Sequence, residues 1–369
     1  MSEVESSASP EARVRRVILP YALWPHSQLA ALDAATLSAL PSLRHLLSQT
    51  TCTSRTYTGN EAQPSLSMPH EHARAAQLGW PLVDGLLPWA AHAATQAGLA
   101  HPGDGSAWGF ISLCHWQISH GLVTLTDPAD LDLDDATDAA LFATMQPFFA
   151  EDGLALHRHL PGVWWVQSPD LAAVPSASLE RVMGDDVDPW LVGGEMTAQA
   201  PVQPMDPTHT AKWQRLQNEM QMLLYTHPAN AGRRVPVNSF WLHGTGALPT
   251  SAALAPHVPP LTDVTQGREW QTACDALRRA HRLADPAAWV HAWQRLDALC
   301  LHIDADEWVL CGTHAIHTHR RSAALGSAWQ GLKRTLSSWM GGASASDWRS
   351  VLGESAAPHA WSSSHRGRA

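Results

Sequence analysis

The sequence WQRLQNEMQMLLYTHPANAGRRVPVNSFWLHGTG, at residues 213–246, carries the strongest structural pattern in the chain. Apolar residues at intervals of three and four share one helical face, with Gln217 at its edge: Trp213, Leu216, Met220, Leu223 and Leu224. The apolar run 237–242 predicts a short buried strand, and Gly244 and Gly246 predict a tight turn where the strand ends. The order helix, loop, strand and glycine turn indicates an α/β fold.

Polar residues gather around this predicted strand, at a place where open α/β sheets bind ligands. Arginine offers a planar fork of donors to an anion, and glycine lets the backbone approach a ligand closely. We therefore predict a site for a small anionic or phosphorylated ligand at Asn230, Arg233, Asn238, His243, Gly244 and Gly246. A structural alternative stays open, in which Asn230 caps a turn, Arg233 is solvated and the glycines only end the strand.

Composition places the chain among large globular proteins. It has 369 residues, of which 45% are hydrophobic and 16% charged, and its 18 Trp exceed its three Tyr and five Phe. This length allows one large domain or two modest ones. The indole rings should carry much of the packing, and their N–H groups will need acceptors.

Charge and hydropathy exclude several partners. A net charge of −10 and a pI near 6.1 give no global field that would attract nucleic acid or a membrane. No apolar stretch approaches the roughly 20 residues that span a bilayer, and residues 1–10 are Ser/Glu-rich, so we expect a cytoplasmic protein. The five cysteines are widely spaced without a C-x-x-C pair, which favours buried free thiols over disulfides or a zinc site.

Periodicity along the chain predicts a discontinuous core. Strands are expected at 14–19, 108–118, 122–125, 154–160 and 163–166, with a late strand pair at 301–311; helices are expected at 29–47, 69–79, 86–99, 134–150, 270–283 and 287–299. Residues 52–67 are expected to form a polar loop. We predict a disordered start at 1–13, an α/β core at 14–106 and 205–325, an inserted α+β subdomain at 107–204, and a C-terminal helix and flexible tail at 326–369.

Several motifs resemble the RpfE-type regulatory protein family of proteobacteria. The resemblance is strongest over residues 213–224, 227–230 and 236–244, and it extends to 69–71, 122–128 and 308–312. More distantly, Asn230, Arg233 and the run 236–246 are similar to a segment of the archaeal-type cofactor-independent phosphoglycerate mutases. That likeness implies an alkaline-phosphatase-like core sheet flanked by helices, with an inserted α+β subdomain.

The family's chemistry uses two metal ions and a Ser or Thr nucleophile, and this sequence departs from that pattern. The first strand leads into Pro20-Tyr21-Ala22-Leu23, where the mutases carry an Asp-Gly metal loop. Pro69-His70-Glu71 stands in place of the nucleophile's Gly-Ser-Asp, and His243 in place of an arginine. The resemblance therefore implies a mutase-like protein without much of the phosphoryl-transfer machinery, and no bound metal is expected.

Further candidate residues lie outside the main pattern. His70, Glu71 and His72 open a predicted helix, where the backbone favours an anion; the alternative is a capped helix with exposed histidines. The sequence around His314, His317, His319, Asp304 and Asp306 is metal-like, but a basic surface strand explains it better. Ser65 and Ser67 are nucleophile candidates by proximity only. Acidic residues between 127 and 138 indicate helix caps and a solvated face.

Three functions remain open. The first is a catalytically reduced, mutase-like protein with a regulatory or small-anion-binding role. The second is an active metal-dependent mutase or phosphohydrolase, in which catalytic His70 or a nearby serine serves as nucleophile and the late histidines bind metal. The third is a protein-interaction module whose partner surface is formed by Trp289, Trp293, Trp329 and Trp339.

Overall fold

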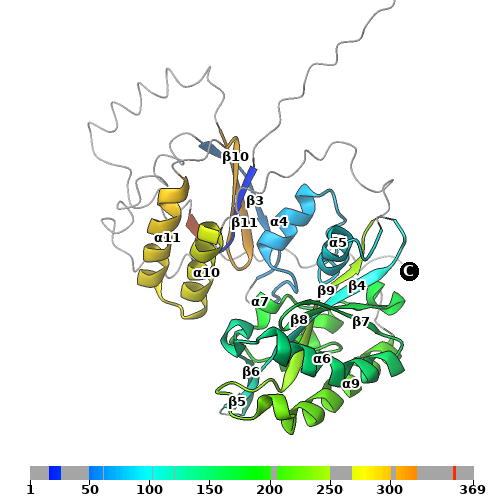
Figure 1. The fold of residues 1–369 in the computed structure, drawn as a ribbon. Helices are drawn as coiled ribbons and strands as arrows, with labels where there is room; N and C mark the ends of the chain where they lie inside the picture. Colours follow the sequence, from blue (N-terminus) through cyan, green and yellow to red (C-terminus); the bar gives the residue numbers. More distant parts are fainter. Residues whose placement is uncertain are drawn as a thin grey trace, which may run out of the picture. The chain divides into compact units, whose positions relative to one another are not determined.

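The computed structural model describes residues 16–25, 50–60, 62–101, 103–119, 121–200, 206–249, 268–300, 305–321 and 352–354 (Figure 1). The chain forms two compact units: Met1–Thr56 with His257–Ser355, here unit 1, and Tyr57–Pro256 with Ala356–Ala369, here unit 2. The predicted disordered start, the helix at 29–47 and the tail from 326 lie outside the described residues, apart from 352–354.

Unit 1 contains a mixed sheet with strand order β1-β10-β11-β3. Its strands are β1 (Arg16–Leu19), β3 (Thr50–Tyr57), β10 (Glu307–Cys311) and β11 (Ala315–Arg321). Strand β1 runs parallel to β10, and β10 pairs antiparallel with β11. A second, small sheet joins β2 (Trp24–Pro25) to β12 (Gly353–Glu354). Together with the helices, this mixed sheet confirms the predicted α/β class.

Strand β3 corrects the prediction of a polar loop at 52–67. Its sequence, TTCTSRTY, is rich in Ser and Thr, which is the reason for predicting a loop there. The threonines are β-branched, however, and such side chains favour extended backbone. Residues from 58 onward are irregular as expected until helix α4 begins at Pro69.

Buried tryptophans fix the loop after β1 in unit 1. Helices α10 (Arg268–Arg282) and α11 (Pro286–Cys300) pack together, and the α11 residues Trp289 and Trp293 are fully buried. Trp289 Nε1 donates to the carbonyl of Tyr21 at 3.0 Å, and Trp293 Nε1 donates to that of Ala22 at 3.1 Å. These two indoles therefore find the acceptors they need, and their burial removes them from the predicted partner surface. Trp329 and Trp339 lie outside the described residues.

Unit 2 is built on an antiparallel sheet with strand order β7-β8-β4-β9 (Figure 1). Its strands are β4 (Ala107–Cys114), β7 (Ala155–Leu160), β8 (Val163–Gln167) and β9 (Ser239–Ala247). A separate hairpin pairs β5 (Trp116–Ser119) with β6 (Leu122–Leu125). The main helices are α4 (Pro69–Gln77), α5 (Trp89–Gln96), α6 (Asp135–Glu151) and α9 (Pro207–Tyr225). Short helices include α7 (Leu179–Val182) and α8 (Glu195–Ala198).

Side chains alternate across the sheet of unit 2. On one face, Ile111 and Leu113 of β4 join the cluster formed with α6 and α9, which includes the predicted helical stripe at Trp213, Leu216, Met220 and Leu224. On the other face, Trp108 and Trp165 pack against alanines of α5. The sheet is thus covered on both faces, and the stripe read from the sequence is confirmed as core.

Strand β9 differs from the prediction in its partner and its glycines. It pairs antiparallel with β4, so residues 239–247 continue the sheet of the predicted insert rather than that of a separate core. The two compact units divide the chain after Thr56, Pro256 and Ser355. The core at 14–106 and 205–325 and the insert at 107–204 stay predictions. Gly244 and Gly246 lie within β9, where a bulge at 108–110 of β4 interrupts the pairing.

The predicted strand at 108–118 divides into two strands of different sheets. Strand β4 ends at Cys114 and β5 begins at Trp116, which pairs with β6 across the predicted hairpin. His115 lies between the two strands, and its Nδ1 atom is held 2.8 Å from the carbonyl oxygen of Pro236. Strand length alone could not predict this change of sheet.

None of the five cysteines forms a disulfide, and Cys114, Cys300 and Cys311 are buried, as the sequence predicts, whereas Cys52 and Cys274 are half-buried. Burial raises the pKa of the Cys114 thiol, which makes it unreactive at neutral pH. In the ranges that the structure describes, no helix has the length and apolar character needed to cross a membrane.

A buried aspartate connects α6 to the β7–β8 hairpin. The predicted solvated acidic face is wrong at Asp138, which is fully buried. Its carboxylate accepts hydrogen bonds from Gly162 N, Trp164 Nε1 and Arg158 Nε, each at 2.8 Å. Asp127 and Asp134, by contrast, accept backbone hydrogen bonds at helix starts, as the sequence predicts. The Asp138 contacts therefore fix the angle between a helix and a hairpin.

Asp138→Ala should lower the free energy of unfolding by about 2–5 kcal/mol, because two buried donors, Gly162 N and Trp164 Nε1, lose their acceptor at about 1–3 kcal/mol each. Asp135→Ala is the matched control, since the exposed Asp135 contacts the same arginine at 2.6 Å. Its cost should stay below about 1 kcal/mol. Urea unfolding of both variants measures the difference, and equal costs would contradict the structural role of Asp138.

Candidate functional site

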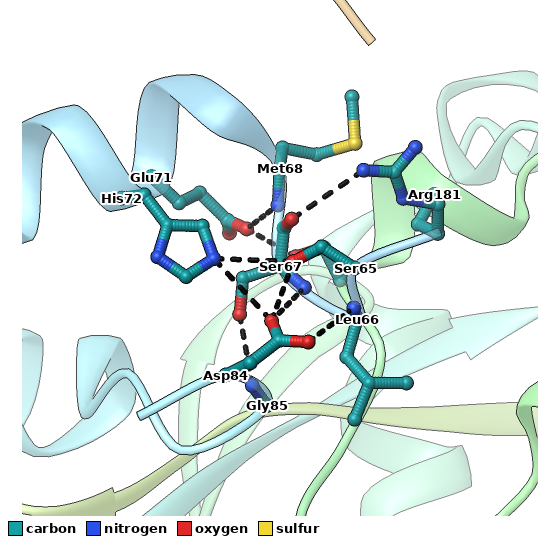
Figure 2. A network of polar contacts seen from close by, with 10 residues as sticks. Ser65, Leu66, Ser67, Met68, Glu71, His72, Asp84, Gly85 and Arg181 are labelled. Carbon is teal, nitrogen blue, oxygen red and sulfur yellow. Dashed lines mark hydrogen bonds and ion pairs between the residues drawn. The ribbon is translucent and has the colours of Figure 1, made fainter. Parts of the chain in front are cut away.

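Asp84 organises the polar network that precedes helix α4 (Figure 2). Its Oδ1 atom accepts hydrogen bonds from Ser65 Oγ at 2.6 Å and Ser67 N at 2.9 Å, and its Oδ2 atom accepts one from Leu66 N at 2.8 Å. In return, Gly85 N donates to Ser67 Oγ at 3.0 Å. Hydrogen bonds from side chains and from backbone N–H groups thereby join two chain segments, 65–67 and 84–85.

The protonation of Asp84 follows from these contacts. Burial alone would raise the pKa of Asp84, but hydrogen bonds from His72, Ser65 and the neighbouring backbone N–H groups outweigh burial and lower it. Asp84 is therefore a stable carboxylate at neutral pH. A carboxylate with a lowered pKa is a weak base, which limits what it can do for the hydroxyl of Ser65.

Ser65, His72 and Asp84 are close together without forming a catalytic relay. His72 Nε2 lies 3.1 Å from Ser65 Oγ and 3.3 Å from Asp84 Oδ1, so the serine and the aspartate meet the same ring nitrogen. A Ser-His-Asp relay needs the acid and the nucleophile on opposite nitrogens of the imidazole. Ser65 is also only 3% exposed. The arrangement is that of a structural clamp, and no local pattern predicts that these three residues meet.

Glu71 closes the start of α4 and contacts α7. Its Oε2 atom accepts from Met68 N at 2.7 Å, which is half of a capping box, and it also accepts a hydrogen bond from Ser178 Oγ. Burial raises the pKa of Glu71 above its usual value, and the neighbouring His70, Ser178 and Met68 N only partly oppose this effect. The predicted capped helix start is therefore confirmed.

His70, the predicted catalytic residue, pairs with a carboxylate. Its Nε2 atom lies 3.5 Å from Glu180 Oε2 on α7, and its side chain is mostly buried rather than exposed. Arg181, the next residue, donates from Nη2 to the carbonyl of Ser67 at 3.4 Å. The charge of Glu180 acts electrostatically on His243 as well as on Glu71. His70, Glu180 and His243 therefore belong to one electrostatic neighbourhood.

His243 is a half-buried, uncharged imidazole. Its Nε2 atom lies 2.8 Å from Ser112 Oγ, and its ring lies 5.3 Å from that of Phe110. Burial lowers the pKa of His243 to about 4, while Glu180 slightly opposes the shift. Below the ordinary pKa of histidine the unfolded chain takes up a proton that folded His243 does not, so this residue contributes stability that is lost on acidification.

The two predicted asparagine ligands are engaged with the backbone. Asn230 donates from Nδ2 to the carbonyls of Leu224 at 2.8 Å and Val237 at 2.7 Å, and its Oδ1 atom accepts from Val237 N at 2.8 Å. Asn238 accepts from Trp116 N at 2.7 Å and donates to Trp116 O at 2.9 Å. The structural alternative for Asn230 is thus correct, and Asn238 serves the same purpose.

Arg233 and the glycines likewise contact protein. The Arg233 guanidinium donates to the carbonyls of Leu131 and Asp132, so it is not simply solvated. Gly244, at φ 62°, lies against Phe110 and Trp89, and Gly246, at φ 138°, lies against Leu86 and Pro88. These glycines let the chain approach the start of α5 closely instead of a ligand.

The predicted anion site therefore does not come together as one cluster. Asn238 and His243 are five residues apart along an extended segment, which separates them by about 16 Å, far beyond hydrogen-bond reach. Of the predicted ligand-binding residues, His243 alone lies in the electrostatic neighbourhood of His70. The sequence could not show this, because Ser112 and His243 are 131 residues apart.

The late histidines lie in unit 1, where His314 is half-buried and His317 and His319 are buried, so they are not on a surface strand as predicted. His317 and His319 are on β11 with 1% and 2% exposure, and only Arg320 and Arg321 at the end of the strand are exposed. Burial, with His317 and Arg55 nearby, lowers the pKa of His319 to about 4. Asp304 lies outside the described residues.

The residues present do not fit the two-metal centre that the mutase resemblance implies. The loop after β1 supplies no acid, and the carbonyls of Tyr21 and Ala22 in it accept hydrogen bonds from Trp289 and Trp293. Across the described ranges, no group of three or more His, Cys, Asp or Glu is placed to hold a metal ion. No chemical step through a metal is therefore assigned to these residues.

No protein-family model matches the chain, and no curated protein matches it. Among solved structures, it is similar to the cofactor-independent phosphoglycerate mutase from Thermoplasma acidophilum DSM 1728, with 13% identity, a TM-score of 0.32, and 85% of this chain and 90% of that chain covered. It is also similar to the PH0037 protein from Pyrococcus horikoshii, with 11% identity, a TM-score of 0.41, and 84% and 88% covered. Both similarities are distant.

Asp84→Ala should lower the free energy of unfolding by about 3 kcal/mol or more at pH 7, because several buried donors lose their acceptor at about 1–3 kcal/mol each. Asp104→Ala is a suitable control: Asp104 also accepts several local hydrogen bonds, but on an exposed loop. That variant should lose less than about 1 kcal/mol.

The effect of Asp84→Ala should also depend on pH. A lowered pKa means that the carboxylate contributes stability above the pKa of an unfolded aspartate, and that this contribution is lost as the pH falls through the folded value. Urea unfolding between pH 7 and pH 3 should therefore show the wild type converging on the variant. A constant gap over this range would rule out an ionised Asp84 as the organiser of the network.

Proposed function

We propose that this chain is a catalytically reduced, phosphoglycerate-mutase-like protein with a regulatory role that depends on binding a small anion. The RpfE-type resemblance and the likeness to mutases with an alkaline-phosphatase-like core are the starting point. The observation that carries the proposal is the state of Ser65, close to the expected nucleophile position. Its hydroxyl is buried and donates to a weakly basic Asp84.

The second serine in this segment supports the same conclusion. Ser67 is 4% exposed, and its Oγ atom accepts the hydrogen bond of Gly85 N. A hydroxyl that attacks phosphorus must be reachable by substrate and adjacent to a base or metal that takes its proton. Ser65 and Ser67 instead stabilise the turn into α4, so these groups favour a binding role over phosphoryl transfer.

The proposed anion site is the neighbourhood of His70. This residue lies in the first turn of α4, where the helix dipole favours negative charge. Arg181 approaches from α7, and His243 lies near the same Glu180 carboxylate. In the absence of ligand, Glu180 pairs with His70, and an incoming phosphate or carboxylate takes the place of that carboxylate. This replaces the larger cluster predicted around Asn230.

Isothermal titration calorimetry with inorganic phosphate and with phosphoglycerate tests the binding role. His70→Ala should weaken binding of either anion about tenfold or more, because a hydrogen bond to a charged group contributes about 1.5–3 kcal/mol. His101→Ala is the matched control, since His101 is an exposed histidine of the same unit. Binding that is absent in the wild type, or equally weak in both variants, would contradict the proposed site.

Mutase and phosphatase assays with added Mg²⁺, Mn²⁺, Co²⁺ or Zn²⁺ separate this proposal from the active-enzyme alternative. We expect no turnover above the level of a Ser65→Ala/Ser67→Ala double variant. Metal-dependent turnover that the double variant or His70→Ala abolishes would establish an active phosphoryl-transfer enzyme instead.

A further inference from the structure

We propose that Glu71 is a proton-operated latch that fastens residues 174–182 to the start of helix α4. This inference concerns the protein without ligand and requires no bound anion, but it bears on the Glu180–His70 contact of the proposed anion site. It rests on the way in which the segment 174–178, here called the strap, is held on both sides and joined to Glu71 at its end.

The strap is held between two parts of unit 2. On one side, Ser176 N donates to Gly85 O and Ser178 N donates to Leu66 O, both at 2.9 Å. On the other side, two side chains of β9 donate to strap carbonyls: Trp241 Nε1 to Ala177 O at 2.9 Å and Thr245 Oγ1 to Val174 O at 2.7 Å. Helix α7 follows the strap directly, so the place of α7 depends on where the strap ends.

At the end of the strap, the Ser178 hydroxyl makes an unusual hydrogen bond. Ser178 is the N-cap residue of α7, a position where a serine side chain ordinarily accepts a hydrogen bond from the helix backbone. Here it makes no side-chain cap, and its hydroxyl donates to Glu71 Oε2 instead. The carboxyl of Glu71 therefore receives a bond that would otherwise stabilise α7, and it joins α7 to α4.

The charges around Glu71 make this joint sensitive to its ionisation. Glu180 is the second residue of α7, and its charge disfavours a second negative charge on Glu71, whereas His70 favours it. Arg181 is directed to the carbonyl of Ser67, and His72 and Asp84 form the clamp beneath the same turn. Burial is the largest effect, and it raises the pKa of Glu71. The folded state therefore favours the neutral form of Glu71 more than the unfolded chain does.

The raised pKa of Glu71 determines how the joint between α4 and α7 responds to pH. An acid whose pKa is raised in the folded state contributes stability that is fully present below its unfolded pKa and is lost as the pH rises through the folded value. As Glu71 ionises, a buried carboxylate faces Glu180 at the joint, and the end of the strap loosens. Helix α7 then releases Glu180 from its position 3.5 Å from His70. The protonation state of Glu71 therefore determines whether the Glu180 carboxylate stays against His70.

Hydrogen exchange of the full chain, corrected at each pH for the intrinsic exchange rate, measures the latch. Protection of residues 179–183 should fall as the pH rises, by about tenfold for each unit by which the pKa of folded Glu71 exceeds the unfolded value. Glu71→Gln keeps an acceptor for Met68 N and Ser178 Oγ but cannot ionise, so its protection should not change with pH. Glu219→Gln, on the half-buried side of α9, is the control and should behave as the wild type.

Ser178→Ala provides a second reading if Glu71→Gln does not fold. It removes the hydroxyl that connects strap and carboxyl, so α7 should already lose protection at low pH, and the remaining pH dependence should be weaker than in the wild type. An unchanged pH profile in Glu71→Gln, or full protection of α7 in Ser178→Ala, would overturn the latch. A wild-type profile that does not vary with pH would overturn it as well.

Discussion

The carboxylate of Asp84 is the constraint on which the candidate site depends. It accepts hydrogen bonds from a serine hydroxyl and two backbone N–H groups in the residues that lead into α4, and it lies 3.3 Å from a histidine nitrogen in the first turns of that helix. Because each of these donors is wholly or partly buried, the carboxylate must stay ionised and in place for the turn to keep its shape. Helix α4 then begins where Glu71 can close its first turn and His70 can reach Glu180.

The same constraint explains why polar residues of catalytic type have a structural role in this protein. Ser65, His72 and Asp84 are the residue types of a hydrolase relay, but both the acid and the hydroxyl face one ring nitrogen. Asn230 and Asn238 are the residue types of a ligand site, but they hold loops against neighbouring backbone. In both cases a buried polar group satisfies the chain itself, which is the commonest use of such groups in folded proteins. The partly exposed side chains of His70, Glu180 and His243 are therefore the candidate groups for binding a ligand.

Local patterns predicted much of the fold, and long-range pairings did not follow from them. The helical stripe on α9 and the hairpin of β7 and β8 were predicted from periodicity and a Pro-Gly turn, since their contacts are close in sequence. The partner of β9 could not be predicted, because an apolar run pairs equally well with a core sheet or with β4. The start of α4 was located by Pro69 and Glu71, whereas Asp84, Ser178 and Glu180 were missed. They meet that start through tertiary contacts that span 12 to 110 residues, and only Ser178, ahead of an acidic helical turn, left a local signal.

Covalent labelling of Ser65 tests the central claim most directly, namely that the Asp84 network is a structural clamp and not a source of reactivity. The full chain is incubated with a fluorophosphonate, which reacts with activated serine hydroxyls, and is then analysed by peptide mass spectrometry with and without added divalent metal. The account predicts no adduct on Ser65 under conditions in which the protein stays folded. Stoichiometric labelling of Ser65 that disappears in His72→Ala would contradict it, because a clamped, buried hydroxyl beside a weakly basic carboxylate has no route to such a reaction.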